Sequence, residues 1–108
     1  MIPDVRIGAR RYAIALTRRP EDDPAEIDHH EGTIVVSDAM TTEATVEMVI
    51  HEILHGLIDD SGLDIDANEV DEEMIVRALA PRVTAFLADN PDQVRELLAM
   101  LAPSPEPT

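Results

Sequence analysis

The stretch TEATVEMVIHEILHGLI, residues 42–58, is the most regular part of this 108-residue sequence. It contains no proline, and its first glycine is Gly56. Asp38, Thr41 and Thr42 precede or open it and offer caps for a helix N-terminus. Its apolar residues recur at spacings of three and four, as a helix with one buried face requires: Val46, Val49, Ile50, Ile53, Leu54, Leu57 and Ile58. The stretch therefore predicts an amphipathic helix in the core.

The same helix carries the pattern HExxH, as His51, Glu52 and His55. Positions i and i+4 lie on one face of a helix, so both imidazoles can reach one metal ion, and imidazole nitrogen suits Zn²⁺. Glu52 follows the first histidine and would lie beside the metal, where it can accept a proton from water. Two ligands and a general base on one turn are typical of a zinc metallopeptidase. The alternative is a core helix with two satisfied histidines and a solvated glutamate.

Composition limits what else the chain can be. It is 44% hydrophobic, with one Tyr, one Phe and no Trp, so a core must rely on smaller apolar side chains. It has no Cys, so any metal site must use histidine and carboxylate ligands. The net charge of −15 argues against nucleic acid as a partner, because phosphate would be repelled. No apolar run reaches the length of a membrane span and no signal-peptide pattern is present, so we expect a cytoplasmic chain without a membrane partner.

Before the helix, the periodicity predicts strands. Residues 5–16 resemble a strand with a bulge or turn at Gly8, and Ile14 and Leu16 are among the residues expected to cover the helix. Residues 19–32 are rich in proline and acids and are expected to form a loop. Residues 33–37 resemble a second strand. The expected fold is α+β, with a small antiparallel sheet of two or three short strands packed on the HExxH helix.

After the helix, the sequence predicts two more helices. The second begins near Glu69 and runs to about Asp89. Asn90 is expected to cap the third, with Pro91 at its first position and Gln93 completing a capping box. Residues 1–102 are expected to form one domain, and residues 103–108, which contain three prolines, a disordered tail.

A catalytic zinc ion usually has three protein ligands and one open position. The expected source of the third ligand is the start of the second helix, where Asp71, Glu72 and Glu73 follow one another. Periodicity alone mildly favours Glu72, since it shares a face with apolar residues further along the helix. An acidic run is also typical of a helix N-terminus, where carboxylates interact favourably with the helix dipole.

HExxH followed by a glutamate on the next helix resembles the gluzincin pattern. The small size is similar to minimal, ImmA/IrrE-type metallopeptidase domains, including short ones encoded by phages. In that group the ligand glutamate is followed by a small or branched residue at +3, an apolar one at +6 and a small one at +7. Counted from Glu73, these positions are Val76, Leu79 and Ala80. The resemblance therefore implies Glu73 as the third zinc ligand.

The chain departs from this group at position +4, where relatives carry an acid or an asparagine that can support a ligand histidine. Here the residue is Arg77, so that support must come from elsewhere. Donors that could stabilise a transition state are Tyr12, His29, His30, Arg77 and Arg82, and the sequence does not rank them. His29 and His30 are otherwise two exposed histidines in a polar turn.

The expected function is that of a zinc-dependent endopeptidase. His51, His55 and Glu73 would hold Zn²⁺, Glu52 would act as general base, and the partner would be a peptide or protein substrate. The strand at residues 33–37 is expected to bind an extended substrate by strand addition. Two alternatives stay open: a zinc-stabilised structural or interaction protein without significant proteolysis, and a regulatory peptidase that cleaves a repressor.

Overall fold

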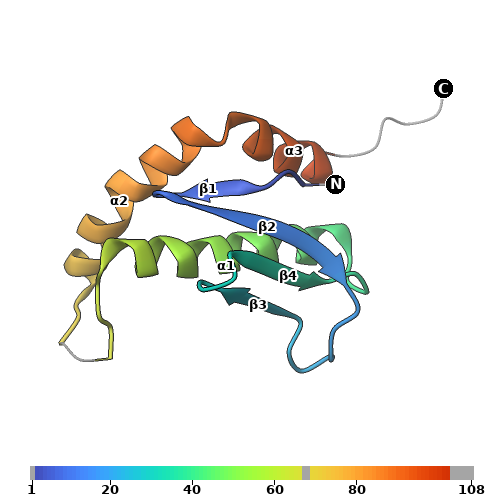
Figure 1. The fold of residues 1–108 in the computed structure, drawn as a ribbon, viewed down its shortest axis with the longest axis horizontal. Coiled ribbons are helices and arrows are strands. Elements are labelled where there is room, and N and C mark those ends of the chain that lie inside the picture. The colour runs from blue at the N-terminus through green and yellow to red at the C-terminus, as the bar shows by residue number, and fades with distance from the viewer. Residues whose placement is uncertain (1, 67–68, 103–108) are drawn as a thin grey trace.

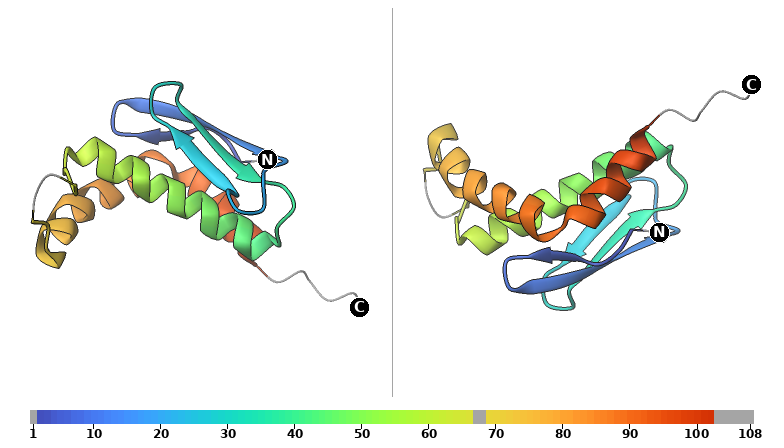
Figure 2. Two further views of the ribbon diagram at one scale, coloured as in Figure 1. Left: turned by 90° about the horizontal axis from the view of Figure 1, so that it is seen from below. Right: turned by 90° about the horizontal axis from the view of Figure 1, so that it is seen from above.

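Four strands and three helices make up the fold in the computed structural model, which describes residues 2–66 and 69–102 (Figure 1). The strands are β1 (Val5–Ile7), β2 (Arg10–Thr17), β3 (Ala25–Asp28) and β4 (Thr33–Ser37), and the helices are α1 (Thr42–Ser61), α2 (Glu72–Asp89) and α3 (Pro91–Leu101). The strands form one sheet in the order β1-β2-β4-β3, with the helices on one of its faces (Figure 2). The α+β prediction is confirmed. The sheet has four strands, and its central β2–β4 pair is parallel, whereas an all-antiparallel sheet of two or three was expected.

Helix α1 is the element on which the others pack. It contacts α2, α3, β1, β3 and β4. The Thr41 hydroxyl accepts a hydrogen bond from the backbone N–H of Ala44 at 3.3 Å, which caps its start. Gly62 ends it in the left-handed conformation, with φ of 74°. The helix predicted for residues 42–58 is confirmed and continues to Ser61.

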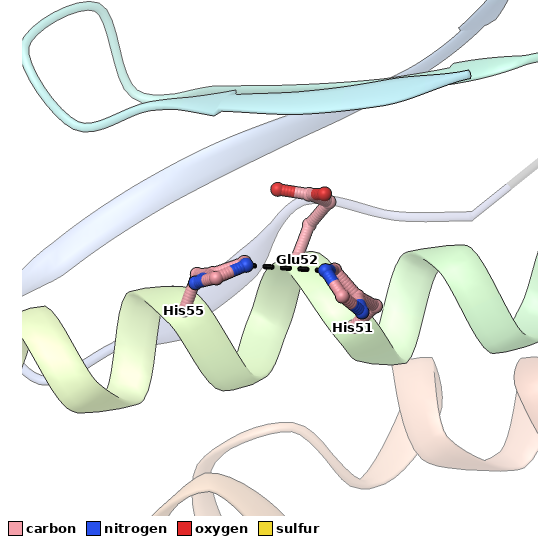
Figure 3. A group of neighbouring side chains, drawn as sticks. All are labelled: His51, Glu52 and His55. Carbon is pink, nitrogen blue, oxygen red and sulfur yellow. Dashed lines mark hydrogen bonds between the residues drawn. The ribbon is translucent and has the colours of Figure 1, made fainter. Parts of the chain in front are cut away.

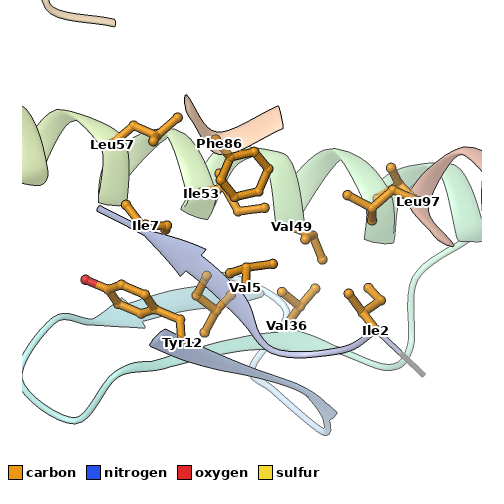
Figure 4. Close-up of a cluster of buried hydrophobic side chains, with 12 residues drawn as sticks. Ile2, Val5, Ile7, Tyr12, Val36, Val49, Ile53, Leu57, Phe86 and Leu97 are labelled. Carbon is orange, nitrogen blue, oxygen red and sulfur yellow. The ribbon is translucent and has the colours of Figure 1, made fainter. Parts of the chain in front are cut away.

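The core lies between α1 and the inner face of the sheet and extends to α2 and α3 (Figure 4). Its buried members are Ile2, Val5, Ile7, Tyr12, Ile34, Val36, Val46, Val49, Ile53, Leu57, Phe86 and Leu97. Burial of each such aliphatic side chain adds roughly 1.5–3 kcal/mol to the free energy of unfolding. In β2 the most deeply buried side chain is Tyr12, at 1% exposure. Ile14 is only partly buried and Leu16 is 45% exposed, so the expectation that Leu16 covers the helix is wrong: β1 pairs with β2 only at residues 10–12 and leaves Leu16 without a neighbouring strand on that side.

Gly56 brings α1 close to the sheet. A Cβ atom at this position would lie 2.7 Å from Cδ1 of Ile7 and 3.3 Å from Cδ1 of Ile27. Real Cβ contacts are almost never as short as the first of these. The missing side chain therefore lets the helix backbone approach β1 and β3, and Gly56 itself is buried.

Strand β3 lies in the segment expected to be a loop, so that expectation is wrong for residues 25–28. The strand has only four residues, and two of them, Glu26 and Asp28, are exposed. The two apolar residues that remain are too few to reveal the alternation typical of a strand. Its hydrogen bonds to β4, in antiparallel register, are what make it a strand. The Asp28 carboxylate accepts hydrogen bonds from the backbone N–H groups of His30 and Glu31, at 2.9 Å each, and so fixes the turn into β4.

The predicted capping box at the start of α3 is wrong. Asn90 precedes the helix without capping it through its side chain. Its Oδ1 instead accepts a hydrogen bond from the Arg6 N–H at 2.7 Å, and its Nδ2 donates to the carbonyl oxygens of Arg6 and Phe86 at 2.8 and 2.9 Å. Gln93 donates to the carbonyl oxygen of Asp4 at 2.6 Å. Both side chains therefore tie the start of α3 to the N-terminal segment, Asn90 to Arg6 within β1 and Gln93 to Asp4 just before it.

The second helix begins at Glu72, three residues later than the position near Glu69 that the sequence indicated. None of the helices in the described ranges is long and apolar enough to cross a membrane. The predicted disordered tail, residues 103–108, lies outside the described residues.

Candidate metal centre

His51, Glu52 and His55 project from the middle of α1 on the side of the sheet (Figure 3). Their potential ligand atoms all lie within 4.8 Å of one another, and no other such group of three or more is found in the part of the chain that the structure describes. The two histidine rings meet edge to face, with centroids 4.8 Å apart. Nε2 of His51 and Nε2 of His55 are 3.1 Å apart. One turn of helix thus turns both nitrogens toward the same point.

These two nitrogens lie within hydrogen-bonding distance of each other, and the group they belong to could hold a metal ion. Bonds from zinc to imidazole nitrogen are about 2.0–2.1 Å long, so tetrahedral coordination places two such nitrogens about 3.3 Å apart. The observed 3.1 Å is close to this separation. His51 and His55 are both exposed, which leaves the point between them accessible to a cation and to further ligands.

Glu52 differs from its two neighbours because it is buried. It is 5% exposed and points from α1 toward the strands (Figure 3). The burial follows from the helix period, since Glu52 shares the sheet-facing side of α1 with Val49 and Gly56. A carboxylate held between helix and sheet, within 4.8 Å of two imidazole nitrogens, is placed to exchange a proton with a water molecule beside a metal ion.

The three residues line a groove of about 810 Å³. Its other walls come from β3, from the C-terminal part of α1 and from residues 62–66. The volume lies within the range of about 300–1,000 Å³ that is usual for ligand sites. Among the residues that the structure describes, four acids besides Glu52 line the groove and no Lys or Arg does: Glu26, Asp59, Asp64 and Asp66. Such a groove attracts cations.

His29 lines the same groove, from the turn between β3 and β4. Its Nδ1 lies 3.1 Å from the hydroxyl oxygen of Tyr12 and 3.6 Å from Oδ2 of Asp59. The sequence named His29 and Tyr12 as donors but could not show that they touch. Asp59 was missed, although its position four residues after His55 put it on the same face of the helix. His30 is exposed and lies outside the groove lining.

The two arginines on the list of expected donors lie elsewhere. Nε of Arg82 is 3.4 Å from Oδ2 of Asp60, and Nε of Arg77 is 3.1 Å from Oε1 of Glu73. Neither arginine lines the groove. Of the five donors that the sequence suggested, only His29 does so.

Glu73 is not brought into the group formed by the two histidines and Glu52. It is exposed in the first turn of α2 and forms an i,i+4 ion pair with Arg77. Asp71 caps the helix, since its carboxylate accepts a hydrogen bond from the N–H of Met74 at 2.9 Å. Glu72 is exposed as well. These acids therefore do what acids at a helix N-terminus ordinarily do, and a third metal ligand from this turn stays a prediction.

Two imidazoles that converge on one point, a buried carboxylate beside them and an acidic groove can together hold a divalent cation and activate water next to it. Comparisons with protein-family models, with curated proteins and with solved structures find no match for this chain.

Proposed function

We propose that this protein is a zinc-dependent endopeptidase of the gluzincin type, similar to ImmA/IrrE-type domains. The observation that carries the proposal is the 3.1 Å approach of the His51 and His55 Nε2 atoms beside the buried Glu52. Zinc is the proposed metal because the donors are imidazole nitrogens with carboxylates nearby, and the chain has no Cys.

Glu52 is the proposed general base. When bound by the two histidines, zinc would supply a Lewis acid that polarises the substrate carbonyl and makes a neighbouring water easier to deprotonate. Glu52 removes one proton from this water while the water oxygen forms a bond to the carbonyl carbon. The C–N bond then breaks, and Glu52 passes the proton to the leaving nitrogen. The products are a carboxylic acid group and an amine, which exchange the remaining proton.

The proposed peptide-binding element is β3. Strand β4, which the sequence suggested, is hydrogen-bonded to β2 on one side and to β3 on the other, so that expectation is wrong. β3 is one of the two edge strands of the sheet, and its residues Ala25, Glu26 and Ile27 line the groove. An extended peptide that pairs with this edge would pass in front of the two histidines.

Glu73 is the proposed third ligand. Its present partner is Arg77, and both side chains of this pair are largely exposed, at 68% and 80%. An exposed i,i+4 ion pair on a helix contributes only about 0.3–0.5 kcal/mol to the free energy of unfolding. Exchanging this pair for a contact with a metal ion therefore costs little.

A second candidate function is zinc binding without proteolysis, in a structural or interaction protein. The observation in its favour is the position of Glu73 outside the group around the two histidines. A regulatory peptidase that cleaves a repressor would use the same chemistry on a more restricted substrate.

Replacement of Glu52 by Gln tests the proposal, with unfolded casein as the substrate and mass spectrometry of the fragments as the measurement. The wild-type protein loaded with one equivalent of zinc is expected to cleave casein. Glu52→Gln is expected to bind zinc within threefold of wild-type affinity and to cleave at least 100-fold more slowly, because the general base is gone. Glu47→Gln, at an exposed position of the same helix, is the matched control and should cleave normally.

Each other outcome is informative. Equal cleavage by wild type and Glu52→Gln would show that Glu52 is not the base. A wild-type protein that binds zinc but leaves casein intact would favour the second candidate function.

A further inference from the structure

The turn between β3 and β4 holds one imidazole against α1. The carbonyl oxygen of His29 accepts a hydrogen bond from the Arg10 side chain at 3.1 Å. The Asp28 carboxylate, one residue before His29, accepts hydrogen bonds from the backbone N–H groups of His30 and Glu31 and so fixes the turn. The backbone that carries the His29 ring is therefore tied both to β2 and to its own turn.

The His29 ring contacts two side chains, those of Tyr12 and Asp59. Nδ1 of His29 is 3.1 Å from the hydroxyl of Tyr12, whose side chain is buried at 1% exposure, and the two rings meet edge to face at 90°. Asp59 lies on the other side, with Oδ2 3.6 Å from the same nitrogen. The His29 side chain keeps 34% of its surface exposed. With Nδ1 engaged, Nε2 is the ring nitrogen left for a ligand.

Two protonation states of His29 that these contacts permit carry a proton on Nε2. When the Tyr12 hydroxyl donates to Nδ1, a neutral imidazole carries its proton on Nε2. When the imidazole is protonated, Nδ1–H faces Asp59 and Nε2 again carries a proton. In both of these states Nε2–H of His29 is a hydrogen-bond donor, on a ring whose orientation the contacts with Tyr12 and Asp59 fix.

The groove offers a substrate few other donors. Among residues 2–66 and 69–102, the lining contains no Lys, Arg, Ser, Thr, Asn, Gln, Tyr or Trp. Of the described side chains in the lining, those with an N–H donor are His29, His51 and His55, and the last two are the proposed metal ligands.

We infer that His29 is a second catalytic residue, which donates a hydrogen bond from Nε2 to the carbonyl oxygen of the peptide bond under attack. This inference rests on the proposed peptidase function. As the water oxygen bonds to the carbonyl carbon, electron density moves onto the carbonyl oxygen, and a donor fixed in advance stabilises that charge. Tyr12 and Asp59 act through His29 and are positioning residues. Loss of one such donor typically lowers kcat by about 10²–10³-fold.

A binding experiment tests this role without turnover. The probe is N-phosphoryl-leucyl-alanine amide, a tetrahedral anion with a charged oxygen in place of the carbonyl oxygen, and the control ligand is acetohydroxamate, a planar chelator. Isothermal titration calorimetry would compare zinc-loaded wild type, His29→Ala and His30→Ala. In His29→Ala the Kd for the phosphoryl probe is expected to rise 10- to 100-fold, with the Kd for acetohydroxamate within threefold. His30→Ala, one residue away and outside the groove lining, should match the wild type. Equal affinity of the two variants for the phosphoryl probe would overturn the inference.

Kinetics on casein separate this inference from the function on which it rests. His29→Ala should keep its zinc and its KM within threefold but lose about 100-fold in kcat, part of which added imidazole should restore. His29→Phe keeps a ring against Tyr12, should fold, and should show the same loss without rescue. If wild type is active, Glu52→Gln is inactive and His29→Ala is as fast as wild type, only the role of His29 fails. If wild type and Glu52→Gln are equally inactive, the peptidase proposal itself fails.

Discussion

The middle of α1 and the first turn of α2 were both expected to supply metal ligands. The two regions differ in whether the structure brings the expected ligand atoms together. In α1, the i,i+4 spacing alone places the Nε2 atoms of His51 and His55 3.1 Å apart. In α2, Glu73 is exposed and paired with Arg77. Ligands within one helix are set by the backbone, whereas a ligand from a second helix also depends on how the chain returns to the first. Three substitutions test this contrast.

The largest effect is expected for His51→Ala. Because it removes one of two converging nitrogens, zinc affinity should fall at least 100-fold, measured by competition with a chromophoric chelator. The melting temperature of the metal-free protein should stay within about 2 °C, since the side chain is exposed, while the increase in melting temperature caused by zinc should disappear. His30→Ala is the matched control, also an exposed histidine. Full zinc occupancy in His51→Ala would show that α1 does not hold the metal.

A smaller loss, about tenfold in zinc affinity, is expected for Glu73→Ala if the first turn of α2 completes the site. Glu72→Ala is the neighbouring control and should bind zinc normally. The opposite result, with Glu72→Ala weakened and Glu73→Ala unchanged, would mean that the ligand lies one residue earlier. Normal binding by both variants would remove α2 from the metal site.

The smallest effect is expected for Arg77→Ala. This substitution frees Glu73 from an exposed ion pair worth about 0.3–0.5 kcal/mol, so zinc affinity should rise about twofold. Arg95→Ala breaks a comparable exposed pair with Asp92 on α3 and should leave zinc binding unchanged. An affinity that does not change in Arg77→Ala would show that the pair does not compete with the metal.

What the sequence could predict follows the same division between local and distant contacts. Helix α1 was predictable because residues 42–58 contain no proline and carry apolar residues at helical spacing from Val46 to Ile58. The approach of His51 to His55 was predictable for the same reason. Strand β3 was not, because its four residues become a strand only through β4. Asn90 was assigned to a helix cap because its partner, Arg6, lies 84 residues away.

The role proposed for His29 also depends on contacts that no local pattern contains. Tyr12 belongs to β2, His29 to the turn before β4, and Asp59 to the last turn of α1. The three side chains meet because the parallel pairing of β2 with β4 brings that turn over the end of the helix. In the sequence, His29 and His30 were equivalent, and only the fold separates them.

Gly56 has a consequence for how such a site can change over generations. It follows His55 directly, and its missing side chain allows α1 to lie against Ile7 of β1 and Ile27 of β3. Ile27 also lines the groove. A descendant that kept both histidines and Glu52 but replaced Gly56 would retain the motif and yet carry its edge strand at a different distance from it. Position 56 can thus be a target of selection on substrate fit even though it offers no atom to metal or peptide.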